Sequence, residues 1–292
     1  MATVKSFGGT EPVIKVHAKI ATATHTTQST TEQLALRAPK IVIIGVGGTG
    51  GWLVPHAARL VKRLGVGSLA LADGDCVERK NLGRQNFVES DLGQNKAIAL
   101  AQRYAGAFGL PIRAIPGMLE DVCGLTRQAP QIVCGCVDKH KARRTIAEYM
   151  ANASETVWID AGNETVAGQV VCGYTGPVFR SGNTAAGPLP FAMPTVSQTL
   201  DLPVDGGTAR PSCADLGAVT EQVSTVNIVA AGLMANFLRL ILEDVKRTQL
   251  RQPVKGLEFG AVYFNVGNGG FKTVFNTPAT LATAQKPMCP WQ

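Results

Sequence analysis

Glycines at a fixed spacing open the part of this sequence that could perform chemistry. Gly45, Gly47 and Gly50 form a G-x-G-x-x-G pattern within KIVIIGVGGTGGW, after an apolar run and before an amphipathic stretch. Glycines let a backbone approach phosphate closely, and the amino end of the following helix offers unpaired N–H groups and a positive dipole. Structural turns share this spacing, so the flanking strand and helix patterns are what make it indicate a nucleotide site.

Carboxylate, amide and cationic side chains follow the next apolar run, SLALAD. Asp73 ends that run and Asp75 comes two residues later. A carboxylate at this place can bind the hydroxyls of a ribose, or can simply cap a loop; Asp73 is the first candidate and Asp75 the second. The cations and amides that follow are Asn81, Arg84, Gln85 and Lys96.

Arg84 and Lys96 are suited to phosphate oxygens in different ways. Arginine presents a planar fork of donors, and lysine presents a compact charge. Taken alone, Arg84 fits a surface ion pair equally well, and Lys96 fits the first turn of any helix. The ordered set of residues, and not one member of it, predicts a phosphate-binding segment.

The bulk composition narrows the class of protein. The chain has 292 residues, of which 45% are hydrophobic, 32 are glycine and 6% are aromatic, which favours a loop-rich α/β protein. A formal net charge of +7 favours acidic partners such as phosphates. No long block of lysine or arginine indicates a nucleic-acid partner. Seven cysteines without a C-x-x-C pair suggest neither a disulfide framework nor a zinc site.

Targeting signals are not evident in the sequence. The first residues, MATVKSFGGTEPVIKV, contain no apolar signal core. The most apolar later stretch, 223–242, contains serine, threonine, asparagine and arginine, and we interpret it as a buried helix with no membrane span. We therefore expect a cytoplasmic protein.

Strand and helix patterns alternate through the first half of the chain. The predicted strands cover 40–45, 68–73, 112–117, 132–138 and 156–162. The predicted helices cover 50–65, 94–109, 120–128 and 139–153. This alternation implies right-handed βαβ crossovers and therefore an α/β fold with a Rossmann-like, doubly wound, mainly parallel sheet.

The second half predicts antiparallel strands that extend this sheet. A strand at 168–174 is followed by a long crossover loop, 175–214, rich in glycine and proline, and then by a long helix at 219–246 and a hairpin at 261–275. We predict an N-terminal extension over 1–38, with a possible edge strand VIKVHAKI at 13–20. The main domain covers 39–280, and a C-terminal tail covers 281–292.

These ordered motifs resemble the ThiF/MoeB family, which includes ubiquitin-activating enzymes and the adenylating enzymes of thiamine and molybdopterin sulfur transfer. The resemblance covers roughly 39–277 and rests on G-x-G-G-x-G, D-x-D, N-L-x-R-Q, a later lysine and an aspartate after a strand. The matching residues are Gly45, Gly47, Gly48, Gly50, Asp73, Asp75, Asn81, Arg84, Gln85, Lys96 and Asp138. The domain 39–280 would then be a ThiF-type adenylation domain.

The resemblance implies that a C-terminal carboxylate attacks the α-phosphate of ATP. Two anions must meet and pyrophosphate must leave, so cations have to surround the triphosphate. In that reaction Arg84 and Lys96 would bind phosphate oxygens, and Asp73 would bind the ribose. Asn81 and Gln85 would add neutral hydrogen bonds.

Asp138 and Cys213 complete the implied machinery. Asp138, in CGCVDK, would hold Mg²⁺, a hard cation that prefers oxygen ligands. Cys213, in SCADLGAVTEQ, matches the position of the family's reactive cysteine and would take the activated acyl group as a thioester. A helix amino end and Arg210 could favour its thiolate; the alternative is a loop cysteine with no role.

The implied partner is a ubiquitin-like or sulfur-carrier protein with a flexible C-terminal tail, and the implied assembly is a homodimer. Two departures from the family pattern stand out. The R-Y-x-R-Q-like segment is absent, Arg37 being the nearest candidate, and Cys172 has no second cysteine nearby, so we predict no structural zinc. Three alternatives remain: a non-catalytic ATP-binding subunit of a ThiF-like pair, a tRNA-modifying relative, and a nicotinamide-dependent oxidoreductase.

Overall fold

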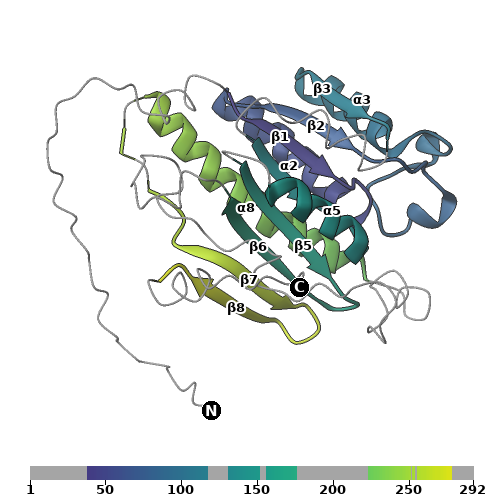
Figure 1. Ribbon diagram of the computed structural model, residues 1–292. Helices are drawn as coiled ribbons and strands as arrows, with labels where there is room; N and C mark the ends of the chain where they lie inside the picture. Colours follow the sequence, from purple (N-terminus) through teal and green to yellow (C-terminus); the bar gives the residue numbers. More distant parts are fainter. Residues whose placement is uncertain are drawn as a thin grey trace, which may run out of the picture.

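An eight-stranded mixed sheet forms the centre of the protein, seen in a computed structural model that describes residues 38–117, 131–151, 156–175, 223–250, 252–253 and 255–277. The strand order is β3-β2-β1-β4-β5-β6-β7-β8 (Figure 1). The strands are β1 (Lys40–Ile44), β2 (Ser68–Ala72), β3 (Ile112–Ile115), β4 (Gln131–Gly135), β5 (Thr156–Asn163), β6 (Ala167–Thr175), β7 (Phe259–Asn265) and β8 (Gly270–Phe275).

The first five strands run parallel, and the last three run antiparallel to their neighbours. β1 lies between β2 and β4, so the chain reverses its direction of winding at this point. In open α/β sheets, ligands bind outside the carboxyl ends of the strands at such a switch point. The predicted fold class is therefore confirmed, and the switch point marks where to look for a site.

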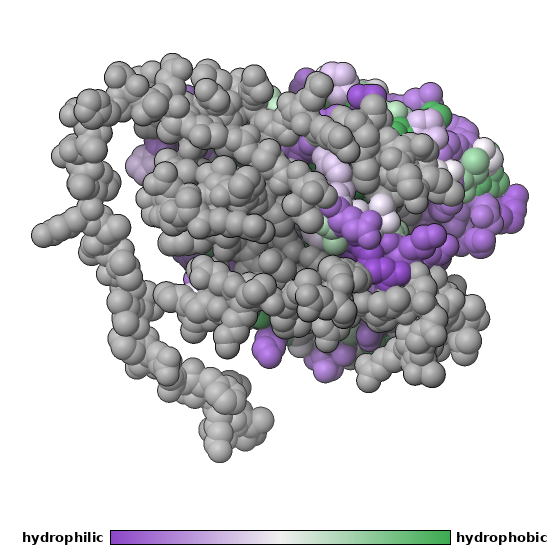
Figure 2. Space-filling model, in the orientation of Figure 1, coloured by the Kyte–Doolittle hydropathy of each residue, from purple (hydrophilic) through white to green (hydrophobic). Residues whose placement is uncertain are grey.

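Helices cover both faces of the sheet. α2 (Gly48–Leu64), α3 (Lys96–Phe108) and α8 (Ser224–Gln249) lie on one face, and α5 (His140–Ala151) lies on the other (Figure 1). Successive residues of a strand point to opposite faces. Ile41 and Ile43 of β1 accordingly join the core under α2 and α8, whereas Val42 and Ile44 join the core under α5. The outer surface over α5 is mostly hydrophilic (Figure 2).

α8 is long and apolar enough to cross a membrane by length and composition alone. It packs on α2, β5 and β6, and it buries Met234, Phe237 and Leu238 in the core. Near its end, the buried carboxylate of Asp244 accepts the backbone N–H groups of Lys255 and Gly256 at 2.9 and 2.6 Å. The predicted buried helix is therefore confirmed.

The boundaries differ slightly from the sequence predictions. α2 begins at Gly48, two residues early, because the last glycines of the loop already adopt helical geometry. The predicted hairpin is present, and Gly269 takes a φ of 70° in its turn. The predicted edge strand 13–20, the helix 120–128 and loop residues 176–214 lie outside the described residues.

Candidate functional site

The glycine loop lies at the switch point, between the ends of β2 and β4. Gly45 follows β1 directly, and its N–H donates to the carbonyl of Ala72 at 2.9 Å. Its φ is 80°, a left-handed conformation that side chains disfavour, and an added Cβ would lie 2.8 Å from the Cys136 carbonyl oxygen. Only glycine fits here, and the loop touches the strand end that leads to Asp138.

The amino end of α2 is open to an anion. Gly47 caps the helix without a side-chain hydrogen bond, and no acidic residue lies in the first turn. The four first N–H groups of a helix have no partner within the helix and carry its positive dipole end. Gly48 and Gly50 allow close packing at this end of the helix. A Cβ on Gly48 would clash with the Asn227 side chain, and a Cβ on Gly50 would clash with the Gly45 carbonyl.

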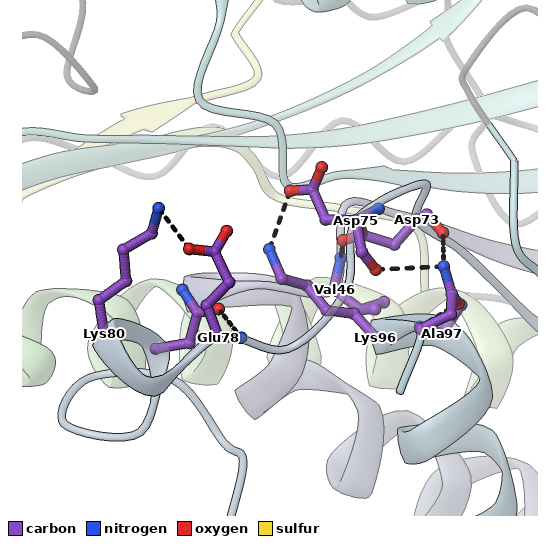
Figure 3. Close-up of polar contacts among 9 residues, drawn as sticks. Val46, Asp73, Asp75, Glu78, Lys80, Lys96 and Ala97 are labelled. Carbon is purple, nitrogen blue, oxygen red and sulfur yellow. Dashed lines mark hydrogen bonds and ion pairs between the residues drawn. The ribbon is translucent and has the colours of Figure 1, made fainter. Parts of the chain in front are cut away.

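Asp73 holds the glycine loop against the end of β2. Its Oδ2 accepts the N–H of Val46 at 2.8 Å, and its Oδ1 accepts the N–H of Asp75 at 2.9 Å (Figure 3). Burial raises the pKa of Asp73, although these two hydrogen bonds oppose the shift. Each carboxylate oxygen has a second lone pair, so binding to ribose hydroxyls remains geometrically open.

Asp75 pairs with Lys96 beside the loop. Lys96 Nζ lies 2.9 Å from Asp75 Oδ2 (Figure 3). The lysine is the first residue of α3, and Asn95 caps that helix by accepting the N–H groups of Ala97 and Ile98. An isolated antiparallel bridge between Cys76 and Asn95 brings the two segments together. Sequence reasoning had placed both residues in the site, but not in contact.

The N-L-G-R-Q segment forms a compact turn next to α2. Asn81 is buried, and its Oδ1 accepts the N–H of Glu78 at 2.8 Å. The carbonyl of Arg84 accepts a hydrogen bond from Trp52 Nε1 at 3.5 Å, and the arginine side chain is half-buried. Asn81 therefore shapes the loop.

Gln85 is the strongest local sign of a ligand. Its side chain is buried and lies against Gly47, 3.4 Å from where a Cβ of that glycine would be. Among the described residues, nothing donates a hydrogen bond to its Oε1. Buried polar atoms normally have partners, so this acceptor calls for a donor such as a ligand hydroxyl group; a phosphate oxygen cannot donate to it.

Two residues that sequence reasoning missed hold this segment in place. Asn86 Nδ2 donates to the carbonyl of Gly51 at 2.9 Å and to the Tyr104 hydroxyl at 2.7 Å. Arg103 of α3 donates to the Asn86 carbonyl at 2.9 Å and forms an ion pair with Asp91. The asparagine next to N-L-G-R-Q was the one available signal; Arg103 could be found only from the packing of α3.

A second missed group joins three elements under the glycine loop. Asn163, at the end of β5, donates from Nδ2 to Thr49 Oγ1 at 2.6 Å and to Asn227 Oδ1 at 3.1 Å. Thr49 also donates to Asn227 Oδ1 at 3.1 Å. These bonds tie the start of α2 to β5 and α8, and so they fix the direction in which the N–H groups of α2 point.

Asp138 is exposed just beyond the carboxyl end of β4. Arg143 holds the adjacent backbone: its guanidinium donates to the carbonyls of Val137 at 2.7 Å and Ala161 at 3.0 Å, and to Asp160 Oδ2 at 2.8 Å. Arg143 and Asp160 are both buried. Sequence reasoning had not singled out this pair, which braces the strand end that carries Asp138.

Burial raises the pKa of Asp160 to about 6, because desolvation outweighs the attraction of Arg143. Between about pH 4, where an unfolded aspartate titrates, and pH 6, the folded state holds the proton more tightly. We expect the free energy of unfolding of the wild type, relative to Asp160→Asn, to fall as pH rises through this window. Urea denaturation of both proteins at pH 4, 5, 6 and 7 measures this difference in the free energy of unfolding. If the wild type instead gains stability over Asp160→Asn as pH rises, the attraction of Arg143 outweighs the desolvation of Asp160.

Some predicted residues cannot be placed. Cys213, Arg210 and Arg37 lie outside the described residues. In the described part of the chain, no group of three or more histidine, cysteine, aspartate and glutamate side chains could hold a metal ion. Asp138 would therefore need phosphate oxygens or water to complete a Mg²⁺ shell, as Mg²⁺ sites at nucleotides commonly do.

The fold and the site together define a Rossmann-like α/β protein with a glycine loop at the switch point of its sheet. Residues 20–263 match the family model described as "ThiF family". The chain therefore belongs to the ThiF family, as the ordered motifs had predicted.

Curated relatives are distant in sequence and longer than this chain. It is 26% identical over 270 residues to "Ubiquitin-like modifier-activating enzyme 5" of Oryza sativa subsp. japonica, covering 87% of this chain and 56% of that protein. It is 27% identical over 203 residues to "Adenylyltransferase and sulfurtransferase uba4" of Neosartorya fischeri, covering 68% and 39%. The chain thus spans about half, or less, of the length of these relatives.

Solved structures share the fold. The crystal structure of E. coli MccB with ATP superimposes with a TM-score of 0.57 at 18% sequence identity, covering 85% of this chain and 68% of that chain. MccB in complex with N-formylated MccA gives a TM-score of 0.56 at 19% identity and covers the same shares. At such low identity the similarity establishes the architecture alone.

Proposed function

We propose that this protein uses ATP to adenylate the C-terminal carboxylate of a ubiquitin-like or sulfur-carrier protein. The observation that carries the proposal is the arrangement beside the glycine loop at the switch point: Lys96, a buried cation, pairs with Asp75, whose N–H donates to Asp73, and Asp73 in turn accepts the Val46 N–H of the loop. Membership of the ThiF family and relatives named as activating enzymes and adenylyltransferases support it.

The residues of the chain would act by placing charge around the triphosphate. The N–H groups of the glycine loop and of the amino end of α2 would donate to phosphate oxygens, and the half-buried Arg84 supplies a fork of further donors. Lys96 adds a positive charge, and its burial strengthens the attraction between that charge and the phosphates. The carboxylate of the partner protein then attacks the α-phosphorus, a new O–P bond forms, and pyrophosphate leaves with the electron pair of the broken P–O bond.

Asp138 is the residue that would hold Mg²⁺. Its carboxylate is exposed, and Arg143 fixes the backbone beside it, so it can reach a phosphate-bound ion without rearranging a core. Mg²⁺ held there would supply positive charge that offsets the charge developing on the leaving pyrophosphate. Asp138 also lies next to the glycine loop through Cys136 and Val137, which a Cβ on Gly45 would touch.

The later steps belong to the same proposal. The thiolate of Cys213 would attack the acyl carbon of the adenylate, form a thioester and release AMP. The partner would present a flexible C-terminal tail, and the active protein would be a cytoplasmic homodimer.

Exchange of labelled pyrophosphate into ATP tests the proposal. With Mg²⁺ and carrier proteins that end in Gly-Gly, we expect exchange by the wild type. Asp138→Ala should lose about 100-fold or more, because the metal neutralises the developing charge. Cys213→Ala should retain exchange, since the thioester forms after adenylation. Glu148→Ala, an exposed carboxylate on α5, is the matched control.

Three outcomes would contradict parts of this proposal. Binding of ATP without exchange for any carrier would favour a non-catalytic subunit. Exchange that Asp138→Ala leaves intact would remove Asp138 from the metal site. Loss of exchange in Cys213→Ala, with folding preserved, would place the cysteine before adenylation.

A further inference from the structure

We propose that Asp75 is an exchangeable counter-ion for Lys96: it holds the ammonium group in the empty site and yields it to the triphosphate. It would thereby weaken nucleotide binding and promote release of pyrophosphate. This inference rests on the proposed function for the identity of the ligand, and it assigns Asp75 a role different from the ribose contact that the sequence suggested.

The two partners of the ion pair differ sharply in exposure. The Lys96 side chain is 9% exposed, whereas the Asp75 side chain is 67% exposed, with Nζ and Oδ2 2.9 Å apart. A buried charge needs a partner, so Lys96 depends on an anion at all times. The exposed carboxylate can turn into solvent at little cost in desolvation. Asp75 is therefore the partner that can leave.

The backbone at this point is fixed while the carboxylate is not. The N–H of Lys96 donates to the Asp75 carbonyl at 2.9 Å, and Asn95 Nδ2 donates to the carbonyls of Asp73 and Asp75 at 2.8 and 3.1 Å. These bonds hold the two main chains together whatever the Asp75 side chain does. An exchange of anions on Lys96 thus requires rotation of one side chain and no movement of the fold.

Among the described acidic groups, Asp75 forms the ion pair with Lys96, although the Lys96 charge also lowers the pKa of Asp73, against the larger effect of burial. Glu78 is engaged by Lys80, with Nζ and Oε2 2.8 Å apart (Figure 3). Asp73 uses both oxygens on the N–H groups of Val46 and Asp75. A triphosphate bound at the glycine loop would compete with the Asp75 carboxylate for the Lys96 ammonium group. The negative charge of Asp75 would also repel the triphosphate.

The ribose role and the counter-ion role predict opposite results for Asp75→Asn. Asparagine keeps the size of the side chain but removes its charge. If Asp75 is the counter-ion, calorimetry with the pure protein should show three- to tenfold tighter binding of ATP and of inorganic pyrophosphate, with adenosine unchanged. If Asp75 binds ribose, ATP and adenosine should both bind more weakly, and pyrophosphate should not change.

A double variant confirms that the effect passes through Lys96. In a Lys96→Met background, Asp75→Asn should no longer tighten pyrophosphate binding, because the contested ammonium group is gone. Glu78→Gln removes a nearby carboxylate of the other ion pair and should change the affinity less than twofold. Thermal unfolding of each variant checks that the fold is intact.

The outcomes separate this inference from the proposed function. Unchanged or weaker pyrophosphate binding in Asp75→Asn, with a wild type that binds ATP, would overturn the counter-ion role alone. Equal tightening by Asp75→Asn with and without Lys96 would reduce the effect to general electrostatics and overturn it as well. A wild type that binds neither ATP nor pyrophosphate would overturn the proposed function and this inference together.

Discussion

Replacing Lys96 with methionine should lower kcat/KM for adenylation by about 100- to 1000-fold, the range seen when one preorganised donor to a developing charge is removed. Methionine occupies much the same space as the methylene groups of the lysine side chain, but it carries no charge. The buried ammonium group beside the glycine loop would disappear, and Asp75 would face the triphosphate without a cation. Pyrophosphate exchange at saturating carrier protein measures the loss.

Lys80→Met is the matched control for this variant. Lys80 also follows β2 and forms an ion pair with Glu78, but its side chain is exposed to solvent. An exposed pair contributes little, so this variant should change kcat/KM by less than about threefold. Equal losses in both variants would mean that net charge, and not the position of Lys96, governs the reaction.

The parallel half of the sheet was predictable because its strands are buried on both faces. KIVII and SLALA leave few polar positions, and no other element type combines such short apolar runs with the glycine loop and the helix patterns around them. Their order in the sheet was not predicted from the sequence. The structure places β1, which leads into the glycine loop, at the switch point.

The contacts inside the site were less predictable. Each residue type and spacing indicated phosphate, but the sequence placed Asp75 as a second ribose candidate. The structure pairs it with Lys96, because the bridge between Cys76 and Asn95 folds the segment back on itself. The bridge between Cys76 and Asn95 forms where Asn95 caps α3, in a segment whose sequence shows no strand pattern, so the sequence did not indicate it.

Residues far apart in sequence were missed for the same reason. Arg143 meets the carbonyls of Val137 and Ala161 only once β4 and β5 are paired, and Asn163 meets Thr49 and Asn227 only once α2, β5 and α8 converge. No local pattern distinguishes these side chains from ordinary helix and strand-end residues.

Gly50→Ala should abolish measurable ATP binding and lower the free energy of unfolding by about 1–3 kcal/mol or more, the range for overpacking a rigid site. A Cβ on Gly50 would fall far inside contact distance of the Gly45 carbonyl oxygen and would lie 3.2 Å from Cys136 Cβ. The first obstacle is backbone, so no side chain can rotate away. Either α2 shifts outward or the Gly45 loop moves, and both displace the N–H groups meant for phosphate.

Gly106→Ala is the matched control, because the same methyl group enters a helix with no heavy atom within 4 Å. Alanine favours helix over glycine by roughly 0.8–1.0 kcal/mol, so this variant should be slightly more stable and should bind ATP as the wild type does. Calorimetry with ATP and thermal unfolding compare the two variants. Normal ATP affinity in Gly50→Ala would show that the phosphates bind away from this loop, and the site would then have to lie elsewhere along the carboxyl edge of the sheet.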